Sequence, residues 1–174
     1  LSYRGCCGRS SAGSGLYAVA DPISPTAPDL IGRRVASQRW SHLAFLHWRV
    51  DAAAIAPLLP PGVRPDEHDG SSWVGVVPFK MNSVMRRPFP DVPWLSFFLE
   101  LNVRLYVEYQ GKPGVWFLSL DATNPIVVWG GNQFFNLPYK NAKMQTFEKD
   151  GMTHYTSSRK GGSDKAEFEV QYKK

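Results

Sequence analysis

Three polar side chains at every second position of one segment are the strongest sign of chemistry in this sequence. Glu100, Asn102 and Arg104 alternate with the apolar residues of 97–109. Successive side chains of a β-strand point to opposite faces, so these three share one face. They predict a site for a polar small molecule, with Arg104 holding an anionic group, Asn102 orienting polar groups and Glu100 acting as acid, base or counter-ion. If that face meets water instead, it is an ordinary sheet surface on which a Glu–Arg pair adds little stability.

A second candidate is Lys140, which follows Leu137-Pro138-Tyr139 just after a glycine-rich turn. A lysine becomes nucleophilic when desolvation or a nearby cation disfavours its charged form. Most lysines are simply solvated, so both interpretations stay open at this point. His47, beside Trp48, is more typical of a packed strand residue than of a catalyst.

Metal and cofactor chemistry finds no support in the motifs. The four histidines show neither HxH nor HxxxH spacing, and the two cysteines, Cys6 and Cys7, are adjacent. No metal site is therefore predicted, and a loop-closing disulfide between neighbouring cysteines is disfavoured. The chain also lacks GxSxG, GxGxxG and P-loop sequences, so no cofactor is predicted. The cysteine usage favours a reducing compartment, and we expect a cytoplasmic protein.

The segments that position these groups are predicted to be mainly antiparallel β-structure. The period-two pattern of 97–109 predicts a strand, and Gly111-Lys112-Pro113-Gly114 predicts a hairpin turn that leads into a partner strand. Asp51 offers an N-cap to a short helix over 52–59, and a helical turn is predicted over 132–137. The remaining predicted strands cover 40–50, 73–81, 115–121 and 126–129, followed by an antiparallel meander over 143–148, 153–158 and 167–172.

Composition bounds the class of protein. The 174 residues carry 20 Lys or Arg and 15 Asp or Glu, for a net charge of +5, but residues 41–142 hold eight of each sign. A nucleic-acid binder concentrates its cations on one face, so nucleic acid is not an expected partner. No apolar run approaches the ~20 residues of a membrane-spanning helix, so a membrane partner is not expected either. Residues 1–39 read as a poorly ordered leader or extension, and 40–174 as the folded domain.

Seven short motifs stand in order along the chain: Trp40–Trp48, Leu59–Gly62, Trp73–Phe79, Glu100–Arg104, Gly114–Phe117, Ser119–Asp121 and Phe135–Tyr139. Together they resemble the YqjF-like family of uncharacterised conserved proteins, which belongs to the acetoacetate-decarboxylase-like superfamily. The resemblance covers about 40–174, and family members continue further, which suggests a C-terminally truncated domain. It implies an α+β fold of mainly antiparallel β-structure, cone-like or an incompletely closed β-barrel, with one or two short helices around a small-molecule cavity.

The same resemblance argues against imine chemistry in this chain. The decarboxylases carry a strand glutamate facing the cavity, which Glu100 matches, and two consecutive lysines after a proline, the first of which forms the Schiff base. Here Pro138 is followed by Tyr139 and Lys140, so the Schiff-base position holds a tyrosine. Gly131-Asn132-Gln133 replaces their Gly-Arg-Glu stretch.

We therefore expect a protein that binds a small organic acid or carbonyl compound in a β-lined cavity. One alternative is a lyase or hydrolase of the superfamily that uses Lys140 or Glu100. Another is a non-catalytic interaction domain, and self-association into a homo-oligomer is left open. The predicted ligand-binding residues, with Tyr139 as a hydrogen-bond donor and two aromatic residues as apolar walls, are Asn102, Arg104, Trp116, Asn132, Phe135 and Tyr139.

Overall fold

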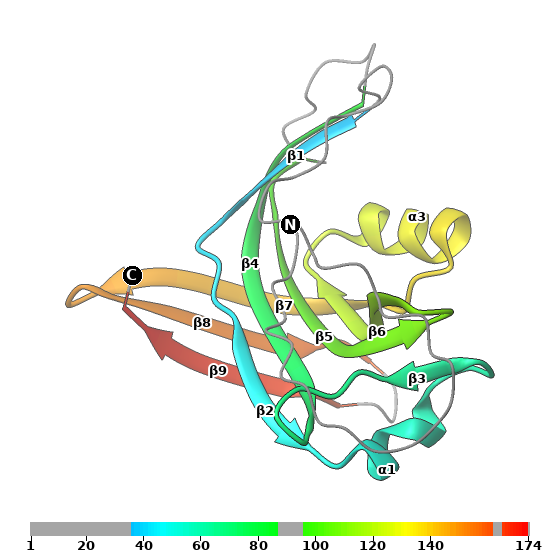
Figure 1. The fold of residues 1–174 in the computed structure, drawn as a ribbon. Helices are drawn as coiled ribbons and strands as arrows, with labels where there is room; N and C mark the ends of the chain where they lie inside the picture. The colour runs from blue at the N-terminus through cyan, green and yellow to red at the C-terminus, as the bar shows by residue number, and fades with distance from the viewer. Residues whose placement is uncertain (1–35, 87–95, 162–164, 174) are drawn as a thin grey trace, which may run out of the picture. The chain divides into compact units, whose positions relative to one another are not determined.

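The computed structural model of the protein describes residues 36–86, 96–161 and 165–173. These residues form a nine-stranded sheet in the order β1-β4-β5-β6-β7-β8-β9, with β2 paired to β4 and β3 paired to β5 (Figure 1). The predicted leader lies almost entirely outside the described residues, and β1 begins at Ala36. The elements are β1 (Ala36–Ser41), β2 (Leu46–Val50), α1 (Ala52–Ile55), the 3-10 helix η1 (Ala56–Leu58), β3 (Val63–Pro65), β4 (Ser72–Arg86), β5 (Phe98–Tyr109), β6 (Lys112–Ala122), α3 (Pro125–Phe135), β7 (Tyr139–Lys149), β8 (Met152–Arg159) and β9 (Glu167–Tyr172).

The chain divides into two compact units, which we describe separately. The first unit comprises described residues 47–75 and 104–116, and the second comprises the other described residues. Strands β4, β5 and β6 each contribute residues to both units.

In the first unit, a capped helix follows β2 as the sequence predicts. The carboxylate of Asp51 accepts a hydrogen bond from the Ala53 amide at 2.9 Å and starts α1. An N-cap of this kind satisfies one of the amides that a helix start leaves without a partner. After η1, β3 pairs antiparallel with β5, and Arg64 forms a 2.6 Å ion pair with Glu108 across that pairing.

In the second unit, the two faces of the sheet pack against different partners. Val77, Phe79 and Phe98 belong to one core cluster, which includes Val128 of α3. The neighbouring residues Val76, Leu99 and Leu101 belong to a second cluster, which includes Met144 and Tyr155 of the β7–β8 hairpin and residues of β9. Because side chains alternate along a strand, β4 and β5 are covered on both faces here.

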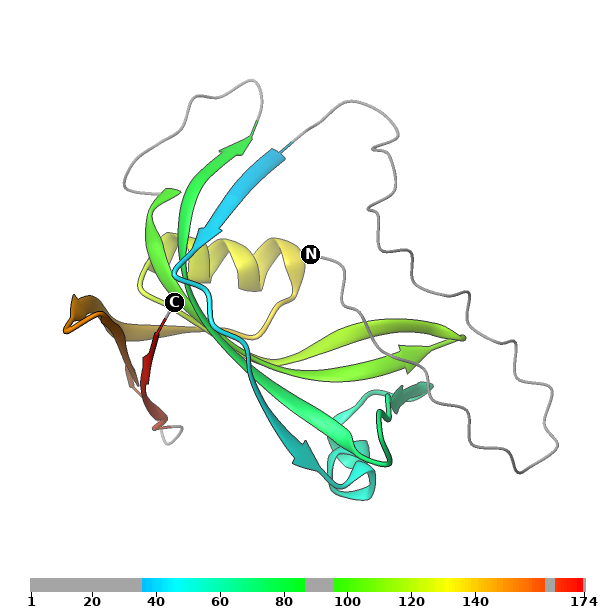
Figure 2. The same cartoon turned by 60° about the vertical axis from the view of Figure 1, so that its left-hand side comes forward.

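The C-terminal meander is confirmed, and β7, β8 and β9 lie side by side in both views (Figures 1 and 2). A two-residue turn joins β7 to β8, with Asp150 at φ +53° and Gly151 at φ +72°. Positive φ at both positions matches the right-handed twist of a hairpin. The link from β6 to β7 departs from the antiparallel expectation, since Leu120 and Tyr139 pair in a parallel register.

The predicted strand over 126–129 is wrong, because these residues form the first turns of α3. Asn124 caps the helix by accepting hydrogen bonds from the Ile126 and Val127 amides, and Pro125 occupies the first helical position. The β-branched run Ile126-Val127-Val128 suggests a strand, but the Asn-Pro start is typical of a helix. The helical turn predicted over 132–137 is the end of this same helix, which Asn136 terminates in the left-handed conformation at φ +50°.

Two further boundaries differ from the predictions. The single strand expected over 40–50 is two strands, interrupted after Ser41 where His42 adopts φ +50°. The β5–β6 turn lies at Gln110 and Gly111, both with positive φ, rather than over 111–114. No helix in the described part of the chain is long and apolar enough to span a bilayer.

Candidate functional site

Glu100 is the central group of the candidate site, which lies in the second unit. Glu100 lies on β5 and is only 3% exposed. This burial raises the pKa of its carboxyl from 4.5 to about 7. The hydroxyl of Tyr139 donates a hydrogen bond to Oε2 at 3.2 Å, which opposes the shift by favouring the carboxylate. At neutral pH this carboxyl therefore exchanges between its acidic and basic forms, as an acid–base group must.

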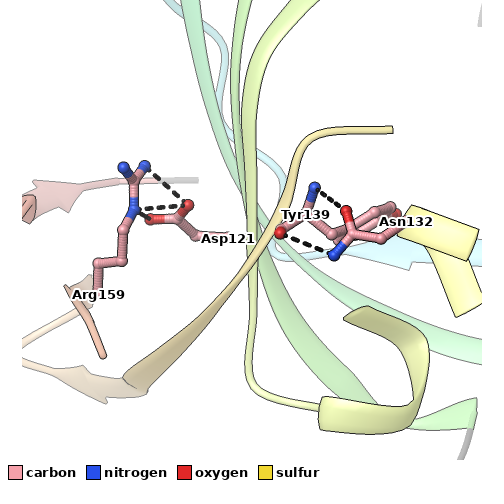
Figure 3. Close-up of polar contacts among 4 residues, drawn as sticks. All are labelled: Asp121, Asn132, Tyr139 and Arg159. Carbon is pink, nitrogen blue, oxygen red and sulfur yellow. Dashed lines mark hydrogen bonds and ion pairs between the residues drawn. The ribbon is translucent and has the colours of Figure 1, made fainter. Parts of the chain in front are cut away.

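Tyr139 is fixed at three points. Its amide donates to Oδ1 of Asn132 at 3.0 Å and its carbonyl accepts from Nδ2 of Asn132 at 3.2 Å, so one side chain of α3 pairs with both backbone groups (Figure 3). Its ring packs on the backbone of Gly131, where any Cβ would overlap ring carbons. Its hydroxyl reaches Glu100. Burial first, and the Glu100 charge second, raise the pKa of Tyr139, so its hydroxyl stays a hydrogen-bond donor.

Asn102 is buried on the same strand, two residues from Glu100. It is 2% exposed, and its Oδ1 has no hydrogen-bond partner among the described residues. A buried polar atom without a partner costs about 1–3 kcal/mol, so natural proteins keep few of them. The Glu100–Asn102–Tyr139 group therefore combines a titrating carboxyl, a phenol and an acceptor that nothing in the described chain satisfies.

Two contacts from the C-terminal meander support the strands that carry this group. Tyr155 is fully buried, and its hydroxyl donates to the Glu100 carbonyl at 2.9 Å. Arg159, at the end of β8, binds both carboxylate oxygens of Asp121 on β6, with Nη2 to Oδ1 at 2.9 Å (Figure 3). Because the bidentate pair is almost fully buried, it fixes the orientation of both side chains.

The other predicted site residues have different surroundings. Arg104 and Trp116 belong to the first unit, where Arg104 donates to the Tyr106 hydroxyl at 3.2 Å. Lys140 is exposed on β7, so burial does not activate it. Phe135 is 74% exposed near the end of α3, and a role as an apolar wall would require the ligand to lie on the outer side of that helix.

Asn132 is exposed, and its side chain hydrogen-bonds to the backbone of Tyr139. It therefore positions Tyr139, a predicted ligand contact, and does not itself add a contact to the ligand. Sequence reasoning did not find Tyr155 or the Asp121–Arg159 pair. The pair spans 38 positions and Tyr155 is 55 positions from Glu100, and neither spacing leaves a local signature. Among the described residues, no three His, Cys, Asp or Glu side chains are grouped as a metal site would need.

Comparison with known sequences identifies the family that this chain matches. Residues 37–174 match the family DUF2071, described as "Uncharacterized conserved protein". The chain is 36% identical over 148 residues to the "Uncharacterized protein YqjF" of Bacillus subtilis strain 168, a match that covers 85% of this chain and 60% of that protein.

Comparison with solved structures indicates the fold. Acetoacetate decarboxylase from Legionella pneumophila has a TM-score of 0.55 at 19% identity, over 89% of this chain and 58% of that one. The enduracididine biosynthesis enzyme MppR, complexed with pyruvate, has a TM-score of 0.55 at 15% identity, over 92% of this chain and 66% of that one. The predicted fold class, mainly antiparallel β-structure of acetoacetate-decarboxylase type with short helices, is confirmed. The chain spans about three fifths of the length of these relatives.

Proposed function

The chain belongs to the DUF2071 family of uncharacterized conserved proteins, and from this premise we propose that it binds a small organic acid or carbonyl compound at Glu100, Asn102 and Tyr139. The unsatisfied Oδ1 of Asn102 beside a buried, titrating Glu100 carries the proposal. A ligand hydroxyl or N–H group would satisfy Oδ1. A protonated Glu100 would donate to a carbonyl or carboxylate oxygen of the same ligand.

The resemblance of the fold to an enzyme solved with pyruvate supports this class of ligand. Pyruvate belongs to that enzyme, and its transfer to this chain is part of the proposal. The predicted contribution of Arg104 and Trp116 to ligand binding, and the cytoplasmic location, stay predictions.

Imine formation is not part of the proposed function. The position that the family resemblance gives to the Schiff-base lysine holds Tyr139, whose phenol cannot form an imine. Lys140, the other candidate, is exposed. If the bound compound reacts, Glu100 is the residue that the structure favours as general acid or base, because its pKa of about 7 lies near neutral pH.

The exposed apolar surface of α3 favours the second alternative, an interaction domain. Trp129, Phe134 and Phe135 are 59%, 72% and 74% exposed, and the first two rings contact each other edge to face. Aromatic residues of this kind are enriched at protein interfaces. Self-association through α3 would make the protein a homo-oligomer without changing the ligand proposal.

Calorimetry with pyruvate and with acetoacetate tests the binding function. We expect saturable binding to the intact protein and a loss of about tenfold or more in affinity in Glu100→Gln and in Tyr139→Phe. The matched control is Lys140→Ala, which removes an exposed side chain next to Tyr139 and should bind as wild type does. The proposal would be refuted if neither compound binds to the intact protein, or if all variants bind with equal affinity.

Borohydride reduction in the presence of the same compounds separates binding from imine chemistry. The wild-type protein should show no mass increment after reduction. An increment that disappears in Lys140→Ala would show that Lys140 forms an imine and would contradict the exclusion of imine chemistry.

A further inference from the structure

A groove along one edge of β7 lies in the second unit, apart from the proposed ligand site. Its volume is about 750 Å³, which is in the range of pockets that hold small organic molecules. We call it the β7 groove. The residues that line it and enter the argument come from four segments and are Lys80, Phe97, Leu99, Thr123, Met144 and Phe147.

The β7 groove exists because β7 separates from β6 after a short parallel pairing. The pairing with β6 covers only residues 139–141 of β7. Beyond Asn141, β7 pairs with β8 on one side, and no strand of the described chain pairs with its other side. The chain leaves β6 at Thr123, whose amide donates to the Leu99 carbonyl and whose hydroxyl accepts from the Leu99 amide, both at 3.1 Å. One side of the groove is thus fixed to β5, and the unpaired edge of β7 forms the other.

Alternation along β4 and β5 separates this groove from the Glu100 site. Lys80 stands between Phe79 and Met81, which belong to the first core cluster, so its side chain points to the opposite face of the sheet. Leu99 belongs to the second cluster and is adjacent to Glu100 on β5, so these two side chains also point to opposite faces. A molecule in the groove therefore contacts the face of β5 that Glu100 does not.

The groove carries one positive charge. Lys80 is the only charged residue among the described residues that line it. The lysine is partly buried, and it forms no ion pair with any residue that the structure describes. A lysine ammonium offers three hydrogen-bond donors and no acceptor, so it complements an anionic oxygen.

The rest of the lining is largely apolar. Phe97 and Phe147 are 46% and 49% exposed, and the Phe147 ring is held by stacking on His154 with the ring centres 4.7 Å apart. Leu99 and Met144 add aliphatic surface between the strands. Apolar walls with a single polar group are typical of sites that bind molecules with an apolar body and one polar end.

We propose that the β7 groove binds an amphipathic monocarboxylate, such as a medium-chain fatty acid. The carboxylate pairs with the ammonium of Lys80, and the hydrocarbon chain covers Met144, Phe97 and Phe147. This site goes beyond the proposed function, because it takes a ligand with a long apolar body on the face of β5 opposite Glu100.

Calorimetry on the intact protein with octanoate as the probe tests the class of ligand. We expect saturable binding of octanoate, about tenfold weaker binding of hexanoate because two methylene groups are lost, and no measurable binding of acetate in this groove. Octan-1-ol keeps the chain without the charge and should bind about fivefold more weakly than octanoate. Absence of octanoate binding, or equal affinity for octanoate and octan-1-ol, would overturn the proposal.

Substitution of Lys80 tests the contact with the carboxylate. Lys80→Gln should lower the octanoate affinity about fivefold and leave the octan-1-ol affinity unchanged. The matched control is Lys149→Gln, which removes an exposed lysine of the same strand pair outside the groove and should bind both probes as wild type does. Equal octanoate affinity in Lys80→Gln and wild type would exclude the proposed pairing.

The methionine methyl groups locate the bound chain. In ¹³C-methyl NMR spectra the Met144 signal, assigned by its loss in Met144→Leu, should shift on addition of octanoate. Met81, in the first core cluster on the other face, is the internal reference and should not shift. Saturable binding without a Met144 shift would place the ligand elsewhere and overturn the proposal.

The two proposed sites can be tested separately. Octanoate affinity should be unchanged in Glu100→Gln and in the presence of excess pyruvate, and pyruvate affinity should be unchanged in Lys80→Gln. Competition between pyruvate and octanoate, or a loss of octanoate binding in Glu100→Gln, would show that octanoate occupies the Glu100 site and would refute the β7 groove as its own site.

Discussion

Tyr139 shows how one residue can be held so that only its hydroxyl is available for chemistry. Asn132 pairs with its backbone, Gly131 receives its ring, and Glu100 accepts from its hydroxyl. Pre-organisation of this kind reduces the ordering that ligand binding must supply. The phenol is thus positioned for hydrogen bonding at the place where the family resemblance expects a lysine.

Removal of the Tyr139 hydroxyl should change how Glu100 titrates. Its hydrogen bond favours the carboxylate, so Tyr139→Phe should raise the pKa of Glu100 further above about 7. A ¹³C-detected titration of the Glu100 carboxyl measures this. Tyr155→Phe is the matched control, because the Tyr155 hydroxyl binds the Glu100 backbone carbonyl rather than its side chain. A lowered pKa in Tyr139→Phe would contradict the assigned hydrogen bond.

Asn102 should be dispensable for folding and needed for binding. Leucine has a similar volume and removes the acceptor that has no partner, so Asn102→Leu should leave the free energy of unfolding within about 1 kcal/mol of wild type or raise it. Pyruvate affinity should fall in the same variant. Urea unfolding and calorimetry on one preparation check both. A loss of several kcal/mol in stability would mean that Oδ1 serves the fold.

At the scale of elements, α3 shows the limit of reading the sequence by apolar pattern. A run of β-branched residues predicted a strand, whereas Asn124-Pro125, as N-cap and first helical residue, indicated the start of a helix. Strand β5 and the meander were predicted well, because period-two alternation and tight turns are local properties. The parallel pairing of β6 with β7 was not predicted, because it depends on how α3, which connects these two strands, directs the chain.

The packing of α3 against β7 can be tested by substitution of two neighbouring glycines of α3. Gly131→Ala should lower the free energy of unfolding by about 2–4 kcal/mol, because the new methyl group overlaps the Tyr139 ring. Gly130→Ala is the control. Its Cβ would lie 4.0 Å from Phe134, and alanine is the better helix former, so stability should rise by up to about 1 kcal/mol. Equal effects of the two substitutions would contradict the packing of Tyr139 on Gly131.

At the scale of the whole molecule, the family and the fold class could be predicted from sequence, but the composition of the candidate site only in part. Glu100, Asn102 and Tyr139 were predicted, the first two from alternation and the third from the family resemblance. Tyr155 was not predicted, because contacts between distant strands depend on register. Alternation alone also does not reveal that Arg104 and Glu100 belong to different compact units.

The buried Glu100 should make the stability of the protein depend on pH. Its pKa is about 7 in the folded state and near 4.5 in the unfolded chain, so the folded state binds more protons between these values. The contribution of Glu100 is full below about pH 4.5 and is lost as pH rises through 7, with a total on the order of 3 kcal/mol.

Urea unfolding from pH 5 to pH 8 measures this effect. The free energy of unfolding of wild type should fall with rising pH relative to that of Glu100→Gln, which keeps the shape of the side chain without its titration. Parallel pH profiles of the two proteins would show that Glu100 does not titrate as inferred.

Leu101 and Asn102 are adjacent on β5 and both buried, one on each face of the strand. A local fluctuation that frees one of them must also disturb the packing behind the other. Their amide hydrogens should therefore exchange with deuterium only when the second unit opens as a whole, which makes them the natural reporters of its opening free energy.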